Sequence, residues 1–300
     1  MTKIMDGKRL ARSIREDTSQ AAGDLAAQGC PPKLAVVVAT DDESTAWFVR
    51  SIARAARQTG ITCDIVDVGP TASTEEIRSA LLTVSQDPDV HGIILQTPLP
   101  AHADPDALQE AIDPAKDIDG ANPVSLGRLV ANVPAFAPAT AHAVMALLEF
   151  HGISLRGKNV AVVGRSTVVG VPIAHLLTRA DATVTVCHRQ TTDLAAHTRS
   201  AEIVVAAAGI PDLITAQHIA EGAVVIDVGT TATKDGRLLG DVDAASVEGR
   251  AGSLTPVPGG VGPVTASLLV QHTVQSASTQ FDRLRTQTSP DLAVVSGRHW

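Results

Sequence analysis

The stretch Asn159-Val-Ala-Val-Val-Gly164-Arg165-Ser166-Thr167-Val168-Val169-Gly170 decides the fold. Its run of apolar, β-branched residues predicts a buried strand, and the glycines that follow predict a tight turn into a helix. Such a turn points backbone N–H groups and the positive end of the helix at one place, which favours a phosphate. The spacing is Gly-x-Ser-x-x-x-Gly and not the usual Gly-x-Gly-x-x-Gly, so a glycine turn that binds nothing is the alternative interpretation.

The next predicted strand, Thr183 to Cys187, ends in His188-Arg189. In a dinucleotide-binding β-α-β unit this strand end lies beside the adenine ribose. An acidic residue there suits the 2′-hydroxyl of NAD, whereas a basic one suits the 2′-phosphate of NADP. Arg165 and Arg189 are placed to bind that phosphate together, although each could instead be a solvated surface arginine. The sequence therefore predicts NADP as the cofactor.

Strands and helices are expected to alternate along most of the chain. Apolar runs predict strands at 34–39, 61–68, 92–96, 203–208 and 223–228, and amphipathic patterns predict helices at 6–28, 44–58, 73–85, 139–151 and from 264 onward. This alternation is typical of an α/β fold with a parallel sheet and helices on both faces. The proline-rich stretch 134–138 indicates a boundary, and the polar tail after 288 is a candidate for disorder.

Composition narrows the class of protein. The net charge of −8 argues against nucleic acid or an anionic membrane as the main partner. The three cysteines have no C-x-x-C spacing, which predicts a reducing, cytoplasmic compartment without disulfides. The ten histidines form no H-x-x-x-H pair, so we expect no metal site. No run reaches membrane-spanning length, and the first residues lack the apolar core of a signal peptide.

Three further segments carry residues suited to binding a ligand. Gln96 and Thr97 follow one predicted strand, and ligands of parallel sheets bind at such carboxyl ends. Asp119, in the loop 116–120, could hold a polar ring edge of a substrate, and bracing its own turn is an equally good interpretation. The glycine-rich loop Pro258–Pro263 is pinned by prolines, which lets the backbone approach a ligand while its shape stays fixed.

Taken together, these segments resemble the methylenetetrahydrofolate dehydrogenase/cyclohydrolase family of bifunctional one-carbon enzymes. The resemblance runs from about Ile4 to about Thr273 and is most specific in the last of the matching segments. The matching segments are 92–100 (GIILQTPLP), 116–120 (KDIDG), 127–129 (GRL), 164–172 (GRSTVVGVP), 225–229 (VIDVG) and 255–263 (TPVPGGVGP).

The resemblance implies two α/β domains flanking a cleft, with a Rossmann-type NADP-binding C-terminal domain, a last helix that returns to the first domain, and a homodimer. It implies a folate-binding catalytic domain at 1–138 plus about 272–288, an NADP domain at 139–271, and a tail at about 289–300. The implied catalytic residues are Gln96 and Asp119. The implied substrate-binding residues are Phe48, Ile52, Leu95, Gln96, Thr97, Asp119, Pro258, Gly259, Gly260, Val261, Gly262 and Pro263. The implied cofactor-binding residues are Thr140, Gly164, Arg165, Ser166, Val169, His188, Arg189, Gly209 and Thr230.

The chain departs from the family on its catalytic helix. The family carries a Tyr and, one helical turn later, a Lys; counting back from Gly60, Phe48 and Ile52 stand at these positions. Arg50 and Arg54 lie two residues away from Ile52 and are expected to point elsewhere. Smaller departures are Thr97 in place of Leu, Ala-Thr-Ala at 139–141 in place of Cys-Thr-Pro, and Thr-Thr at 230–231 in place of Ile-Asn.

These departures affect the two family reactions differently. Oxidation of the methylene bridge passes a hydride to the nicotinamide and needs alignment but no proton acceptor. Hydrolysis of the methenyl product needs a general acid–base, because water loses a proton as it attacks. We therefore expect a dehydrogenase with weak or lost cyclohydrolase activity. The alternatives are a paralogue that accepts a different substrate and a catalytically dead NADP- or folate-binding protein.

Overall fold

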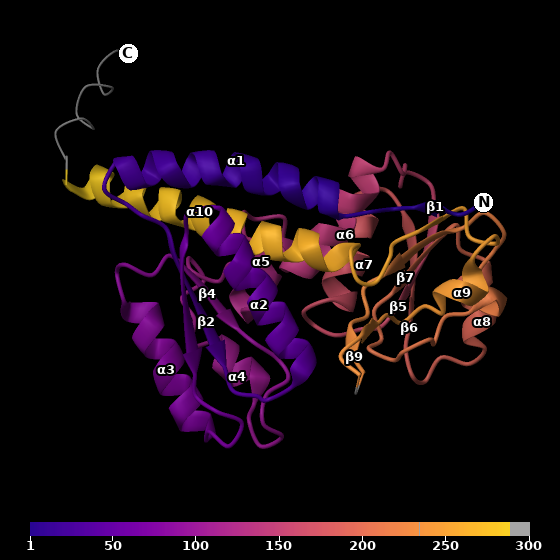
Figure 1. Ribbon diagram of the computed structural model, residues 1–300, viewed down its shortest axis with the longest axis horizontal. Helices are drawn as coiled ribbons and strands as arrows, with labels where there is room; N and C mark the ends of the chain where they lie inside the picture. Colours follow the sequence, from indigo (N-terminus) through magenta and orange to yellow (C-terminus); the bar gives the residue numbers. More distant parts are fainter. Residues whose placement is uncertain (234, 289–300) are drawn as a thin grey trace, which may run out of the picture.

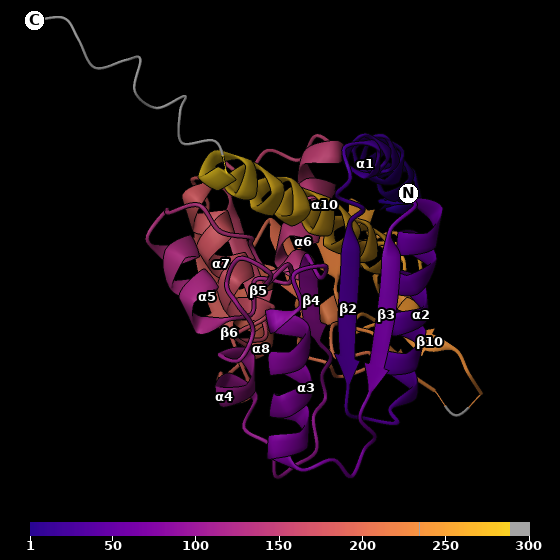
Figure 2. The same cartoon turned by 90° about the vertical axis from the view of Figure 1, so that its left-hand side faces the viewer.

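Two parallel sheets with packed helices form the architecture (Figures 1 and 2). The computed structural model describes residues 1–233 and 235–288, so the predicted tail at 289–300 lies outside the described residues. The larger sheet has the strand order β1-β11-β8-β7-β5-β6 and the smaller sheet has the order β3-β2-β4. The strands are β1 Lys3–Ile4, β2 Lys33–Val38, β3 Thr62–Asp67, β4 Gly92–Leu95, β5 Asn159–Val163, β6 Thr183–Cys187, β7 Ile203–Ala206, β8 Val224–Asp227 and β11 Ser253–Leu254; β9 Thr231–Ala232 and β10 Leu238–Leu239 form a separate antiparallel hairpin.

The helices cover both sheets and fill the connections between strands. They are α1 Lys8–Ala27, α2 Glu43–Gln58, α3 Thr74–Gln86, α4 Pro105–Gln109, α5 Pro123–Val130, α6 Ala139–Phe150, α7 Gly170–Arg179, α8 Leu194–Arg199, α9 Ala244–Val247 and α10 Val261–Thr288, with a short 3-10 turn at Ala216–His218. The predicted α/β fold and its parallel sheets are confirmed. No helix of the described residues is long and apolar enough to span a membrane.

Local sequence sets where several of these elements begin. At α3 the Ser73 hydroxyl accepts a hydrogen bond from the Glu76 N–H, and the Glu76 carboxylate accepts one from the Ser73 N–H. This reciprocal pair satisfies backbone donors that the first turn of a helix leaves open. At α2 the Asp42 carboxylate accepts from the Thr45 N–H at 2.8 Å. This cap fixes the start of the helix that carries Phe48 and Ile52.

The chain crosses between the two sheets at both of its ends. β1 pairs with β11 in the larger sheet, and α1 then runs away from it alongside α10 (Figure 1). α10 also packs against α2, α6, β2 and β4, so the last helix reaches the smaller sheet, as expected. The segments that follow β4, β5, β7 and β8 converge, because residues 96, 169, 209 and 230 lie around one space between the sheets.

Candidate functional site

The predicted glycine turn joins β5 to α7 as a packed structure. Gly164 has a φ of +127°, and a Cβ at this position would lie 2.0 Å from the Ala207 carbonyl oxygen. A Cβ at Gly170 would lie 2.2 Å from the Gly164 carbonyl oxygen. Only glycine fits both places, because the turn folds back on itself and against the end of β7. The strand, turn and helix therefore follow one another as predicted.

Arg165 and Arg189 follow neighbouring strand ends. Val163 of β5 is paired with Cys187 of β6, and each arginine lies two residues beyond its paired residue. Both side chains are exposed, and neither forms an ion pair with any residue in 1–233 or 235–288. The preceding His188 is half-buried, and its N–H donates to the Thr191 hydroxyl at 2.8 Å. Two unpaired guanidinium groups are thus available at this edge of the sheet.

A cavity of about 410 Å³ brings together residues that lie far apart in the sequence. Its walls combine predicted substrate residues from around the smaller sheet with predicted cofactor residues from around the larger one. The predicted residues that line it are Phe48, Leu95, Gln96, Thr97, Asp119, Thr140, Val169, Gly209 and Thr230. Such a mixed lining is what a reaction between two bound molecules requires.

Two polar side chains in this cavity are available for a ligand. Gln96 is buried, yet its side chain forms no hydrogen bond with another residue of the described chain. Asp119 accepts one long hydrogen bond, 3.4 Å from the Ala139 N–H. Burial and, as a smaller contribution, the neighbouring charge of Asp117 together raise the pKa of Asp119 to about 7. A ligand with N–H donors would satisfy both groups and draw Asp119 toward its ionised form.

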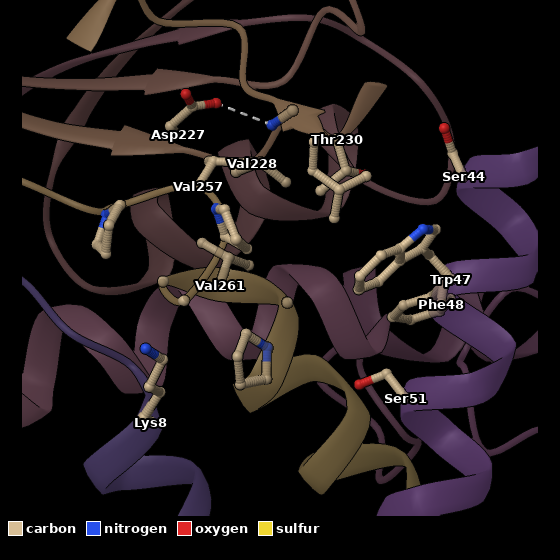
Figure 3. Close-up of a pocket in the computed structure, with 18 of the residues that line it drawn as sticks. Lys8, Ser44, Trp47, Phe48, Ser51, Asp227, Val228, Thr230, Val257 and Val261 are labelled. Atoms are coloured by element: carbon tan, nitrogen blue, oxygen red, sulfur yellow. Dashed lines mark hydrogen bonds between the residues drawn. The ribbon is translucent and has the colours of Figure 1, made fainter. Parts of the chain in front are cut away.

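A second cavity of about 420 Å³ lies between α2 and the glycine-rich loop (Figure 3). Trp47 and Phe48 project from α2 on one side, and Val257 and Val261 lie on the other side. All six residues of Pro258–Pro263 contribute to the lining. The two cavities share Ser44, Phe48 and Thr230, so they are neighbouring parts of one cleft.

The expectation that Arg50 and Arg54 point elsewhere is wrong, because both line this second cavity. Residues 47, 50, 51 and 54 share one face of α2 at helical spacing, and that face is turned to the loop. The Arg50 guanidinium also stacks over the Trp47 ring, 5.4 Å from its centroid. Together with Lys8 these arginines place three cations at the cavity, and none is ion-paired with a residue of the described ranges.

Ile52 departs from its expected place in the substrate site. Its side chain is fully buried and belongs to the apolar cluster that contains Ile94, Ile118 and Leu269. It lines neither cavity. An aliphatic group has no polar end to direct toward the cleft, so it packs into the core behind Phe48. This arrangement therefore gives Ile52 no direct contact with a ligand in either cavity.

Two buried carboxylates that the sequence did not single out as site residues organise the loops beside the cleft. Asp241 accepts from the Ala208 N–H at 2.6 Å and from the Gly209 N–H at 2.9 Å. Asp227 accepts from the N–H groups of Gly229, Asp241 and Val242, and burial raises its pKa to about 7. Asp227 stands in a matching family segment, but nothing local to residue 241 indicates that it reaches back to residue 209. Both carboxylates act on backbone, so they shape the cofactor side of the cleft.

Comparison with known proteins supports this geometry. The family model described as tetrahydrofolate dehydrogenase/cyclohydrolase, catalytic domain, matches residues 5–119, and the NAD(P)-binding domain of the same family matches residues 138–281. The chain is 69% identical to bifunctional protein FolD 1 of Rhodococcus jostii over 96% of this chain and 97% of that protein. It is 62% identical to bifunctional protein FolD 1 of Saccharopolyspora erythraea over 92% of this chain and 94% of that protein.

Solved structures agree with the sequence matches. The N5,N10-methylenetetrahydrofolate dehydrogenase-cyclohydrolase (FolD) of Trypanosoma brucei, complexed with NADP cofactor and inhibitor, superposes with a TM-score of 0.89 at 36% identity. That match covers 93% of this chain and 98% of the other. The bifunctional FolD enzyme of Campylobacter jejuni superposes with a TM-score of 0.88 at 36% identity, over 93% of this chain and 99% of the other.

Proposed function

The chain belongs to the tetrahydrofolate dehydrogenase/cyclohydrolase family, and from that premise we propose that it is an NADP-dependent 5,10-methylenetetrahydrofolate dehydrogenase with weak cyclohydrolase activity. One observation carries the proposal. The cavity that holds Gln96 and Asp119 also holds Thr140, Gly209 and Thr230, whereas position 52 is an aliphatic residue sealed in the core. The cleft thus retains the means to align two ligands but has no amine at position 52, where the family carries its lysine.

The cleft suits each part of a folate. Asp119 and Gln96 would accept and donate hydrogen bonds at the polar edge of the bicyclic ring, and Phe48 offers an aromatic face beside it. The loop Pro258–Pro263 and Trp47 provide an apolar wall for the central part of the molecule. Lys8, Arg50 and Arg54 line this part of the cleft, and their positive charges would attract the carboxylates of its glutamate end.

The other side of the cleft fits NADP. The Gly164–Gly170 turn leaves no room for a Cβ and presents backbone at the end of β5, as a phosphate cradle does. Arg165 and Arg189 follow neighbouring strand ends without an ion-pair partner in residues 1–233 and 235–288, and they would bind the 2′-phosphate. When bound, NADP⁺ supplies the hydride acceptor. The residues of this chain bind the cofactor and the substrate, orient them toward each other, and exclude water.

The same residues account for an imbalance between the two family reactions. Removal of hydride from the methylene carbon leaves a cation, and no ammonium at position 52 opposes that charge. Attack of water on the methenyl carbon requires a group that takes a proton, and Phe48 and Ile52 cannot do so. The relatives with 69% and 62% identity are named bifunctional. The competing hypothesis is therefore that this chain hydrolyses the methenyl product with a side chain other than those at positions 48 and 52.

The test is a two-wavelength assay with 5,10-methylenetetrahydrofolate and NADP⁺, which follows NADPH and the methenyl product separately. We expect NADPH to form while the methenyl product accumulates well above its level in a spontaneous-hydrolysis control. If the methenyl product disappears as fast as NADPH forms, weak cyclohydrolase activity is disproved. If there is neither turnover nor folate binding, the whole proposal fails, and a different substrate or a binding role takes its place.

Replacing Arg189 by Ala tests the cofactor preference. We expect the KM for NADP⁺ to rise about 10- to 100-fold, which corresponds to the loss of one or two charge-assisted hydrogen bonds. The KM for NAD⁺ should change less than about threefold, because NAD⁺ has no 2′-phosphate to lose. The matched control is Arg179→Ala at the far end of α7. Equal losses for the two cofactors would show that Arg189 does not meet the 2′-phosphate.

A further inference from the structure

Behind the catalytic cleft, two histidines from different helices form a hydrogen-bonded pair. His142 of α6 and His272 of α10 are 130 residues apart, and His142 Nδ1 lies 3.2 Å from His272 Nε2. The two imidazole rings are nearly parallel, with centroids 5.4 Å apart, and the Phe136 ring stacks on His272 with centroids 4.7 Å apart. His272 is buried, with 3% of its surface exposed. Nothing in the proposed reaction uses this pair.

The partners of the pair determine where its protons lie. His272 Nδ1 lies 2.8 Å from the Ile118 carbonyl oxygen, which can only accept, so Nδ1 carries a proton. Burial lowers the pKa of His272 to about 4, so its ring is neutral at pH 7 and Nε2 is an acceptor. His142 must therefore donate through its own Nδ1. Burial lowers the pKa of His142 as well, against an opposing effect of Glu149, which agrees with a neutral pair.

This chain of hydrogen bonds ends at the peptide that carries Asp119. Ile118 directly precedes Asp119, and the Asp119 carboxylate accepts from the N–H of Ala139, in the first turn of the helix that carries His142. The next residue, Gly120, has a φ of +64°, and its Cα lies so close to Phe136 that a Cβ would be 2.5 Å from the Phe136 carbonyl oxygen. The Ile118–Asp119 segment is thus hydrogen-bonded to α6 through Asp119 and to α10 through Ile118, and the histidines join these two helices.

We propose that His272 and His142 are positioning residues for Asp119, acting as a neutral, hydrogen-bonded pair that sets the orientation of the Ile118–Asp119 peptide in the cleft. The role rests on the proposed function, because Asp119 is there the group that holds the folate ring. A displacement of about 1 Å in such a group can cost on the order of 100-fold in rate. The pair needs no contact with substrate to have this effect.

α10 itself supplies a matched control. Along one face of this helix His272, Ser276 and Gln280 each donate to a backbone carbonyl, those of Ile118, Ala115 and His91. Ser276→Ala removes a bond of the same kind, one helical turn away from His272, to a residue three positions before Ile118. If α10 only stabilises the fold, loss of either bond will lower stability and leave the kinetics alone.

The experiment compares His272→Leu with His272→Asn. The Asn amide N–H takes the place of Nδ1–H, so His272→Asn should keep kcat/KM within about threefold of the parent, whereas His272→Leu should lower it about 10- to 100-fold. In an Asp119→Asn background His272→Leu should have almost no further effect, because the pair acts through Asp119. Ser276→Ala should leave kcat/KM unchanged. Additive losses in the double variant, or equal losses in Leu and Asn variants, would overturn the proposal.

Two measurements cover the remaining outcomes. If His272→Leu fails to fold, His272→Ala serves in its place, because it removes the donor to the Ile118 carbonyl in the same way with a smaller side chain. ¹⁵N-NMR of the imidazole groups in the intact protein, assigned with the Asn variants, should show the Nδ1–H tautomer for both residues at pH 7. An Nε2–H tautomer or a charged ring at either position disproves the pair. This readout needs no substrate, so a parent without turnover would overturn the proposed function and still leave the pair tested.

Discussion

Ile52→Lys combined with Phe48→Tyr is expected to raise hydrolysis of 5,10-methenyltetrahydrofolate about 10²- to 10⁴-fold, the usual contribution of a general acid–base. The double substitution places an amine at position 52 and a phenol at position 48, at helical spacing, where this chain has neither. Position 52 is fully buried, so the new amine would be desolvated and its pKa lowered toward neutrality, which suits a proton acceptor. The measurement is the loss of methenyl absorbance, corrected for the spontaneous rate.

A matched control separates the amine from the change in packing. Ile52→Met with Phe48→Tyr adds length at position 52 without a titratable group, and it should leave hydrolysis near the parent rate. The lysine variant should also be less stable than the methionine variant, because a buried ammonium disfavours the folded state. If the methionine variant hydrolyses as well as the lysine variant, the loss of activity that we attribute to Ile52 has another cause.

Asp119→Asn is expected to lower kcat/KM for methylenetetrahydrofolate about 100-fold, equivalent to about 2.7 kcal/mol. The Asn side chain keeps the shape of Asp119 but cannot offer two acceptor oxygens to the N–H groups of a folate ring. Exposed Glu110, which lines neither cavity, supplies the control Glu110→Gln. We expect that variant to behave like the parent, and a similar loss in both would exclude a specific role for Asp119.

The pKa of Asp119 also predicts a pH dependence. Its pKa in the free protein is raised to about 7, so the carboxyl is mostly neutral at pH 6 and mostly ionised at pH 8. A ring with N–H donors binds the ionised form, so substrate affinity should rise with pH through about 7. The Asp119→Asn variant should lose this dependence. Isothermal titration with tetrahydrofolate and NADP⁺ at several pH values would measure it, and a flat profile in the parent would contradict the assignment.

The sequence predicts those parts of the fold and the site that depend on neighbouring residues. The apolar run at 34–39 becomes β2 and the glycine turn at 164–170 joins β5 to α7, because period, β-branching and glycine act within a few residues. Gln96 and Asp119 follow strand ends or sit in a loop beside them, and the rule for parallel sheets already places them near a ligand. β1 could not be predicted in this way. A strand of two residues is too short to show a hydrophobic period, and its partner strand β11 lies 250 positions away in the sequence.

Long-range packing decides the remainder. The rotation of α2 about its axis depends on the elements that pack against it. The sequence therefore does not reveal that Arg50 and Arg54 face the loop at 258–263 while Ile52 joins the core. Likewise His142 and His272 have no shared motif, and their pairing exists only because α6 and α10 cross beside Asp119. In both cases the missing information is the direction of a side chain, which neighbours far along the chain determine.

The chain crosses repeatedly between its two lobes, which are the two sheets with their helices, and this has a mechanical consequence for the cleft between them. The polypeptide passes from one sheet to the other three times: between β1 and α1, between α5 and α6, and between β11 and α10. A pair of lobes on one connection can swing freely, but three connections restrain both twist and separation. The two walls of the cleft are therefore held at a nearly fixed separation. Ligands meet a cleft whose width is largely set before they bind. One cut in any of these connections would still leave the lobes tied together by the other two.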